Sequence, residues 1–290
     1  MEFLTTFING LSQGGVYAMI AIGYTMVYGI AKMLNFAHGD IIMVGGYTIL
    51  VFMNMNFNPL IAALVAVLFC VGLGVAIEKV AYKPLRGASP LAVLITAIGI
   101  SKFLQSIAQI TMGSNGKQVI VGDFGVMNIG GLAIETKRVI TLVCTIAIMI
   151  ALSLFIKYSK TGRAMIATSE DRAATQLMGI SVNKIITITF AIGSALAAVA
   201  SLFSLMESPS INSTYGSMPG IKAFTAAVIG GIGSIPGAML GGVLLGLIES
   251  FAAKVPEVAP FTAAIEFGIL IVILLVKPSG ILGKKRREKV

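Results

Sequence analysis

The sequence predicts an all-α integral membrane protein, because it is strongly apolar, poor in charge and divided into long apolar runs. Of its 290 residues, 57% are hydrophobic and only 11% are charged, whereas a soluble domain carries roughly 25% charged residues. The mean hydropathy is +0.95. A chain of this composition cannot cover a core with polar surface, so we expect a lipid bilayer to surround it.

Each apolar run is expected to be a helix, because every backbone group inside a bilayer must be paired within the protein. The runs lie at about 8–30, 40–56, 59–80, 90–112, 137–157, 184–206, 222–234, 237–253 and 261–276. The length suits about eight to ten spans in one transmembrane domain, 1–290. The run at 222–234 is too short to span unaided, which predicts a broken or re-entrant helix there.

The distribution of Lys and Arg predicts the orientation. Most of the 21 basic residues lie at Lys32, at 79–89, in the loop at about 158–183 and in the tail 277–290. Cytoplasmic loops carry such an excess, so these segments and the C-terminus are expected in the cytoplasm. Lys222 is expected on the opposite side, and Lys102 lies within a span. The net charge of +9 is thus explained by membrane anchoring, and we expect no nucleic acid partner.

The chain has a single His, which sits in the polar interruption at 35–40. Asn35, His38 and Gly39 there are candidates for a helix break on a translocation pathway, because transporters often bind substrate at such breaks. The alternative is a polar turn at the cytoplasmic boundary, with Asn35 capping the next helix. With no second His and no Cys cluster, we expect no metal site.

The densest Gly and Pro cluster is a second candidate for a pathway segment. It lacks the Gly-Lys-Ser/Thr ending of a phosphate-binding loop. Such a cluster permits either a helix break that lines a path or close helix packing, and the sequence leaves both open. Its candidate residues are Gly230, Gly231, Gly233, Pro236 and Gly237.

Two acidic residues lie within apolar runs, where ionisable groups are costly and often functional. Glu249 is the deeper one, and its alternatives are a transport role or a pair with a polar group on a neighbouring helix. Glu266 lies nearer an expected helix end, where it could face headgroups. Glu78 precedes basic residues at the cytoplasmic boundary, which favours a local charge pair.

Two loops are longer than a simple connection requires. The outer loop at 113–136 contains short β-prone pieces at 119–126, which indicate either a small hairpin or a mobile connection. The inner loop predicts a short amphipathic helix, capped by Ser169 and stopped at Gly179. Its two acids suit the N-terminal end, and its apolar face comprises Ala173, Ala174, Leu177 and Met178.

No enzymatic site is apparent in the chain. A Ser-His-Asp arrangement is implausible around one His at a helix break, and no ATP-binding loop is present. We therefore expect that the chain itself is not an enzyme and holds no cofactor, and that any energy from ATP comes through another chain.

Nine segments spread along nearly the whole chain carry a resemblance to a known family. They are 23–30, 35–39, 77–86, 162–164, 170–171, 177–180, 223–228, 230–237 and 278–283. No single segment is specific, but their combination and order resemble the LivH-type permeases of high-affinity branched-chain amino acid importers.

The resemblance implies a type II-like permease of an ATP-binding-cassette importer in a bacterial inner membrane. It implies a second, LivM-like permease, two cytoplasmic LivG/LivF-like ATPases that use ATP and Mg, and an extracytoplasmic amino-acid-binding protein. By the same resemblance the inner-loop helix docks the ATPases, and alternating access carries leucine, isoleucine or valine. The implied coupling residues are Arg163, Glu170, Asp171, Arg172, Ala173, Ala174, Leu177 and Gly179.

The docking segment departs from the common Glu-Ala-Ala pattern with Gly six residues after the Glu. Here Gly179 follows Glu170 by nine residues. Three rivals also remain: an importer permease for urea, short amides or another amino acid, an autonomous ion-coupled secondary transporter, and an intramembrane enzyme built on His38 and Asp40. The secondary transporter would need several acids at mid-membrane depth, and the intramembrane enzyme lacks partner residues.

Overall fold

The structure, a computed structural model, describes residues 2–122, 124–129 and 132–283 of the chain. Nine helices run through the apolar segments of this described part. They are α1 Glu2–Ala31, α2 His38–Asn54, α3 Pro59–Ile77, α4 Pro90–Met112, α5 Thr136–Tyr158, α8 Val182–Glu207, α9 Ser217–Gly230, α10 Ile235–Ala252 and α11 Thr262–Val276.

The short elements lie between these helices. The inner loop forms α6 Lys160–Glu170 and α7 Arg172–Leu177, the π-helix η1 Glu78–Tyr82 extends α3, and the 3₁₀ turn η2 Ala259–Phe261 precedes α11. The four short strands are β1 Lys117–Gln118, β2 Val126–Ile129, β3 Leu132–Glu135 and β4 Ser210–Ile211.

Seven helices of the described chain are long and apolar enough to cross a membrane, judged by length and composition, when α3 is joined to η1 and α11 to η2. The two remaining helices, α2 with 17 residues and α9 with 14, fall short. At 1.5 Å per residue α9 reaches only about 21 Å, less than a hydrocarbon core of about 30 Å. The predicted multi-pass helical membrane fold, with short helices among the spans, is confirmed.

Several helices begin with a polar cap followed by Pro at the first turn. Asn58 Oδ1 accepts a hydrogen bond from Leu60 N at 2.9 Å before α3. Ser89 caps α4 and Ser234 caps α10 in the same way. Pro is tolerated at these positions because the first amide groups of a helix have no intrahelical partner. These local signals fix where the helices start.

The contacts divide the chain into two compact units, which are described separately. Unit 1 comprises Met1–Thr25, Phe124–Met149 and Lys222–Val290, and unit 2 comprises Met26–Asp123 and Ile150–Ile221. Both units contain membrane-spanning helices. The single transmembrane domain at 1–290 stays a prediction, and the basic run at 284–287 of the tail lies outside the described residues.

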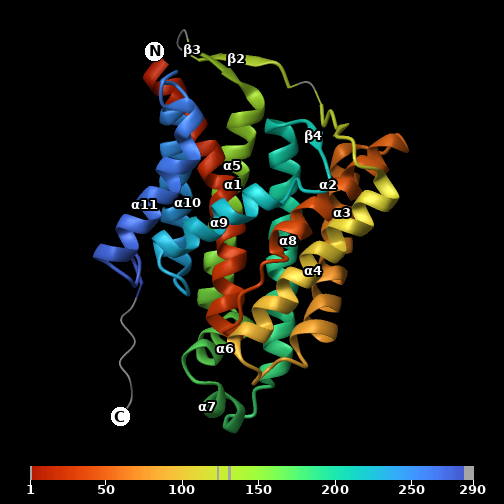
Figure 1. The fold of residues 1–290 in the computed structure, drawn as a ribbon, viewed down its shortest axis with the longest axis vertical. Helices are drawn as coiled ribbons and strands as arrows, with labels where there is room; N and C mark the ends of the chain where they lie inside the picture. The colour runs from red at the N-terminus through yellow and green to blue at the C-terminus, as the bar shows by residue number, and fades with distance from the viewer. Residues whose placement is uncertain (1, 123, 130–131, 284–290) are drawn as a thin grey trace. The chain divides into compact units, whose positions relative to one another are not determined.

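Unit 2 is built on α2, α3 and α8, which pack against one another (Figure 1). Small residues permit their close approach. A Cβ placed on Gly74 of α3 would lie 1.9 Å from Ser194 Oγ of α8. Cys70 of α3 is fully buried, and its thiol donates to Ile41 O at 3.6 Å. It therefore behaves as a small hydrophobe.

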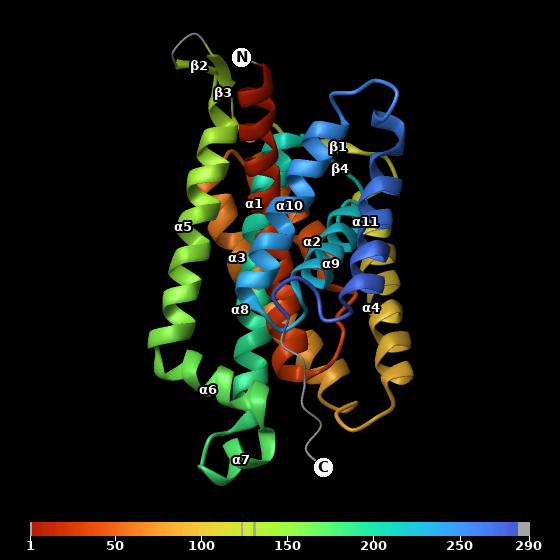
Figure 2. The ribbon, with the colours of Figure 1, turned by 90° about the vertical axis from the view of Figure 1, so that its left-hand side faces the viewer.

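In unit 1, α10 runs beside α11 (Figure 2), and α10 also packs closely against α1. A Cβ on Gly242 of α10 would lie 2.4 Å from Ala18 Cα. A Cβ on Gly246 would meet Gly14 N at 2.2 Å. Glycines at these positions therefore let two helix backbones touch, which is a common way for membrane helices to associate.

The outer loop forms a hairpin, one of the two alternatives for it, but later in the sequence than its β-prone pieces indicate. Strands β2 and β3 pair antiparallel, with Val126 opposite Glu135. The earlier segment instead runs beside the end of α8 within unit 2, where Lys117 pairs with Ile211 and Val119 N donates to Pro209 O. Val119 is buried at 2% exposure, so tertiary burial rather than hairpin formation uses the β-prone residues there.

Candidate functional site

The interruption between α1 and α2 is a true helix break within unit 2. α1 ends at Ala31, and Lys32 adopts a left-handed φ of 53°. Asn35 is only 3% exposed, and its Oδ1 accepts a hydrogen bond from Tyr82 Oη at 2.9 Å. The expected capping of α2 by Asn35 is wrong: Ala37 occupies the N-cap without a side-chain bond, because the amide oxygen of Asn35 serves Tyr82.

The residues of the break are buried rather than exposed. His38 opens α2 at 1% exposure. A Cβ on Gly39 would lie 2.5 Å from Gly216 O, just before α9. The structure thus brings the candidate break residues Asn35, His38 and Gly39 together in a protected place.

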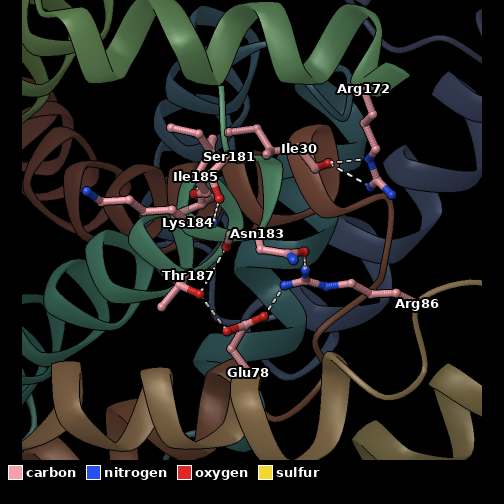
Figure 3. A network of polar contacts seen from close by, with 10 residues as sticks. Ile30, Glu78, Arg86, Arg172, Ser181, Asn183, Lys184, Ile185 and Thr187 are labelled. Atoms are coloured by element: carbon pink, nitrogen blue, oxygen red, sulfur yellow. Dashed lines mark hydrogen bonds and ion pairs between the residues drawn. The ribbon is translucent and has the colours of Figure 1, made fainter. Parts of the chain in front are cut away.

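A network of polar contacts lies on the same side of unit 2 as the end of α1 (Figure 3). Glu78, fully buried at the start of η1, forms an ion pair with Arg86 and accepts a hydrogen bond from Thr187 Oγ1 at 2.8 Å. Arg86 also donates to Asn183 Oδ1 near the start of α8. The predicted local charge pair of Glu78 is confirmed, with Arg86 as its partner.

The π-helix η1 links this network to the helix break. Glu78 is its first residue and Tyr82 its last. Tyr82 is fully buried, and its ring lies 5.3 Å from the ring of Phe190 in α8. Isolated π turns often occur at functional sites. Here one such turn holds the Arg86 ion pair at one end and the break residue Asn35 at the other.

Arg172, the first residue of α7, reaches to the end of α1. Its Nε and Nη2 donate to Ile30 O at 3.2 and 2.7 Å (Figure 3). Ile30 O is one of the last carbonyls of α1, which have no partner within the helix. A cation there also suits the negative end of the helix dipole. Partial burial, with the nearby charge of Arg86, lowers the pKa of the Arg172 guanidinium from its ordinary value.

The inner loop contains two helices where the sequence predicts one. Asp171, not Ser169, is the N-cap: its Oδ1 accepts from Ala174 N at 3.0 Å. Ser169 lies inside α6 and donates to Ile166 O, and Glu170 ends α6. The extended backbone of Asp171, with φ −150°, separates the two helices. The predicted cap and the predicted placement of Glu170 at a helix start are therefore wrong.

The predicted stop and the apolar face of this segment are present. Gly179 has φ +79°, a conformation that favours glycine. Leu177 and Met178 are 88% and 80% exposed, and α7 protrudes beyond the ends of α6 and α8 (Figure 2). The remaining coupling candidates Arg163, Ala173 and Ala174 are also exposed. Within unit 2 these side chains form a surface that no described residue of the unit covers.

The Gly and Pro cluster is a tightly packed turn in unit 1. α9 ends at Gly230, and Gly231 and Gly233 have φ of +109° and +95°. Gly230 and Gly237 touch: a Cβ on Gly230 would lie 1.9 Å from Gly237 O. Pro236 stands in the first turn of α10. The structure thus shows close packing here, and a pathway role for these residues stays a prediction.

The acidic residues of the apolar runs meet a Lys inside unit 1. Lys222 Nζ lies 2.7 Å from Glu249 Oε1 and 3.3 Å from Glu266 Oε1. Tyr17 Oη of α1 donates to Glu249 Oε2 at 2.7 Å. For Glu249 the pair with a neighbouring helix is therefore what the structure shows. We refer to Lys222, Glu249 and Glu266 as the buried charge triad.

Two expectations about this triad are wrong. Lys222 is not in an outer loop but in α9, 9% exposed. Glu266 does not face headgroups, since it is fully buried beside Lys222. Charge pairing explains both, because unpaired charges inside a membrane are costly. Among the described residues, no three His, Cys, Asp or Glu side chains are grouped to hold a metal.

The sequence did not indicate three functional candidates that the structure shows: the carbonyl of Ile30, Tyr82 and the cluster around Gln105 described below. Tyr82 lies among basic residues in the sequence, and only its packing reveals its link to the break. For the cluster around Gln105, the one signal available in the sequence was Lys102, a charge within an apolar run.

The sequence of the chain matches a known family of transport proteins. Residues 6–275 match the family described as "Branched-chain amino acid transport system / permease component". The chain is 46% identical over 303 residues to the high-affinity branched-chain amino acid transport system permease protein BraD of Pseudomonas aeruginosa, across the whole of this chain and 98% of BraD. It is 42% identical over 308 residues to the corresponding LivH of Escherichia coli, with the same coverage.

More distant relatives extend the comparison. A probable branched-chain amino acid transport permease protein LivH of Methanocaldococcus jannaschii is 30% identical, over 95% of this chain and 91% of that protein. Among solved structures, a chain of PsaBC from Streptococcus pneumoniae in complex with Fab aligns with a TM-score of 0.50 and 17% identity, covering 93% of this chain and 91% of that chain. That likeness shows the fold alone.

Proposed function

The chain belongs to the family of branched-chain amino acid transport permease components, and on that premise we propose that it is the membrane-spanning half of an ATP-driven importer for leucine, isoleucine and valine. The observation that carries the proposal is full-length similarity above 40% to permeases of high-affinity branched-chain amino acid systems. The multi-pass helical structure with seven candidate spans supports it.

The proposed partners are a second, related permease, two cytoplasmic ATPases and an extracytoplasmic binding protein. The ATPases supply ATP and Mg chemistry, since no ATP-binding loop is present in the sequence. The exposed Leu177 and Met178 of the protruding α7 support an ATPase docking surface, because large exposed apolar side chains in an otherwise polar loop mark contact surfaces. α7 and the tail from Lys277 are placed in the bacterial cytoplasm by this proposal.

In the proposed importer, ATP hydrolysis is coupled to transport through a connection from α7 to the helix break. Arg172 ties the first turn of α7 to Ile30 at the end of α1, and α1 leads directly into the break at 32–37. A displacement of α7 by an ATPase therefore pulls on the end of α1. The binding protein and ATP both favour a state different from the resting one, which is what alternating access requires.

Similarity to permeases named for branched-chain amino acids favours these substrates over urea or short amides. The acids of the buried charge triad are paired with Lys222, which supports the importer over an ion-coupled secondary transporter.

Affinity purification of the tagged chain from mild detergent tests the proposal. A second permease and two ATPases should accompany it, and the binding protein should bind the complex when loaded with leucine. A stable chain that brings no ATPase from cells expressing the whole operon would exclude the importer, and ion-gradient-driven uptake would become the next experiment.

A further inference from the structure

The second half of α4 carries a polar face. A basic residue, two amides and two hydroxyls, three of them exposed and two half-buried, recur there at intervals that place them on one side of the helix. We call these residues the polar face of α4: Ser101, Lys102, Gln105, Ser106 and Gln109.

The exposed surface of the same helical turns has a second, apolar side. Phe103, Ile107 and Ile110 are 64%, 41% and 84% exposed, and Leu104 and Ala108 pack inward. α4 thus has one face toward the interior, one apolar face suited to lipid and one polar face. Because charged side chains within a membrane face protein or water rather than lipid, Lys102 is directed toward something other than lipid.

The polar face is held in place by a chain of hydrogen bonds within unit 2. Lys102 Nζ donates to Gln105 Oε1 at 3.1 Å. Gln105 Nε2 donates to Asp40 Oδ1 at 2.8 Å and lies 3.4 Å from Ser217 Oγ. The Gln105 amide therefore links an exposed ammonium to a carboxylate that is only 2% exposed. The Asp40 carboxylate orients the Gln105 amide, and the oxygen of that amide orients the Lys102 ammonium.

This chain of bonds ends where two short helices begin. Asp40 lies in the first turn of α2 and Ser217 is the first residue of α9. The backbones meet directly, since a Cβ on Gly216 would lie 1.7 Å from Gly39 O. Discontinuous helices that start inside a membrane protein are common places for transported solutes to bind. The cation of Lys102 is thus presented beside the helix break.

We propose that the polar face of α4 lines the translocation path and that Lys102 binds the carboxylate of an amino acid as it passes, with Gln105 and Asp40 as positioning residues. Charge complementarity supports this occupant. An ammonium held by a neutral amide keeps donors for a ligand anion, and a single charge-assisted bond suits a solute that must leave again. The inference rests on the proposed function, since it names a contact for that importer's substrate.

The test uses the complete importer in proteoliposomes, with binding protein saturated by leucine. Lys102→Met removes the charge and keeps the length of the side chain, Lys102→Arg keeps the charge, and Lys117→Met is the control because Lys117 is exposed in β1 outside the spans. We expect Lys102→Met to lower leucine uptake by about tenfold, the worth of one charge-assisted hydrogen bond. Lys102→Arg should retain most uptake, and Lys117→Met should match the native chain.

A second measurement asks what Lys102 faces. In a Lys102→Cys variant lacking the two native cysteines, Cys70 and Cys144, a membrane-impermeant sulfonate thiol reagent should modify the new thiol, and leucine with cycling ATP should slow that modification. An aminoethyl thiol reagent, which restores an ammonium, should recover uptake, whereas the sulfonate should not.

Three results would overturn the inference. They are native uptake by Lys102→Met, failure of the impermeant reagent to reach Lys102→Cys, and loss of the second permease from Lys102→Met preparations, which would make this face a subunit interface. Absence of ATP-driven uptake by the native complex is a different result, because it contradicts the proposed function itself.

Discussion

The contact between Arg172 and the end of α1 gives the sharpest prediction about coupling. Arg172→Met removes both donors to Ile30 O, which lie 3.2 and 2.7 Å from it. A hydrogen bond from a charged donor contributes about 1.5–3 kcal/mol. Since the guanidinium is only half-buried, the lower end of about 1.5 kcal/mol applies. That value corresponds to about a tenfold change in the equilibrium that connects α7 to the helix break.

The assay is the number of leucine molecules imported per ATP hydrolysed by the reconstituted complex. We expect Arg172→Met to lower this ratio by about tenfold, because ATP hydrolysis continues while α1 no longer follows α7. Arg172→Lys keeps a cation near the C-terminal end of α1 but lacks the paired donors, so its ratio should fall in between. Lys79→Met, which changes an exposed cation of η1, is the matched control. A native ratio for Arg172→Met in a normally assembled complex would refute the reasoning.

Three further changes test other parts of the structure. Lys222→Met leaves two carboxylates without their cation and should destabilise the chain by about 3–5 kcal/mol, as measured by a thermal melt in detergent. Adding Glu266→Gln should restore part of the lost stability. An unchanged melting temperature for Lys222→Met would contradict the triad. Leu177→Glu should abolish ATPase co-purification without lowering the amount of chain in the membrane, and retained ATPase would remove α7 from the docking surface. Gly241→Ala places a Cβ 2.0 Å from Ala226 O and should cost about 1–3 kcal/mol, whereas Gly268→Ala, with nothing within 4 Å, should be neutral; equal melts for the two would contradict the packing.

The helices were predictable because the constraint that forms them is local. An apolar run in lipid must pair its own backbone groups, so the runs at 59–80 and 90–112 match α3 with η1 and α4 closely. Cap and Pro signals at Ser89 and Pro90 fix helix starts without reference to tertiary structure. The short α9 was visible for the same reason, since its run is bounded by glycines.

The polar contacts were not predictable, because each depends on partners far away in the sequence. Asn35 has the chemistry of a cap, but its oxygen is taken by Tyr82, 47 residues later. Asp171 rather than Ser169 caps α7, because the backbone is extended at Asp171 between α6 and α7. Lys222 and Glu266, 44 residues apart, appear in sequence as unrelated boundary charges. Their pairing follows only from the arrangement of the helices that carry them.

The proposed function makes this chain the permease half of an ATP-driven importer whose substrates are branched-chain amino acids. The most direct measurement is uptake of radiolabelled leucine by proteoliposomes that contain the purified complex, with ATP inside the compartment that faces the ATPases and with binding protein on the other side. We expect uptake that requires ATP and the binding protein together and that excess isoleucine or valine suppresses. Uptake by the chain alone, driven by an ion gradient and indifferent to ATP, would contradict it.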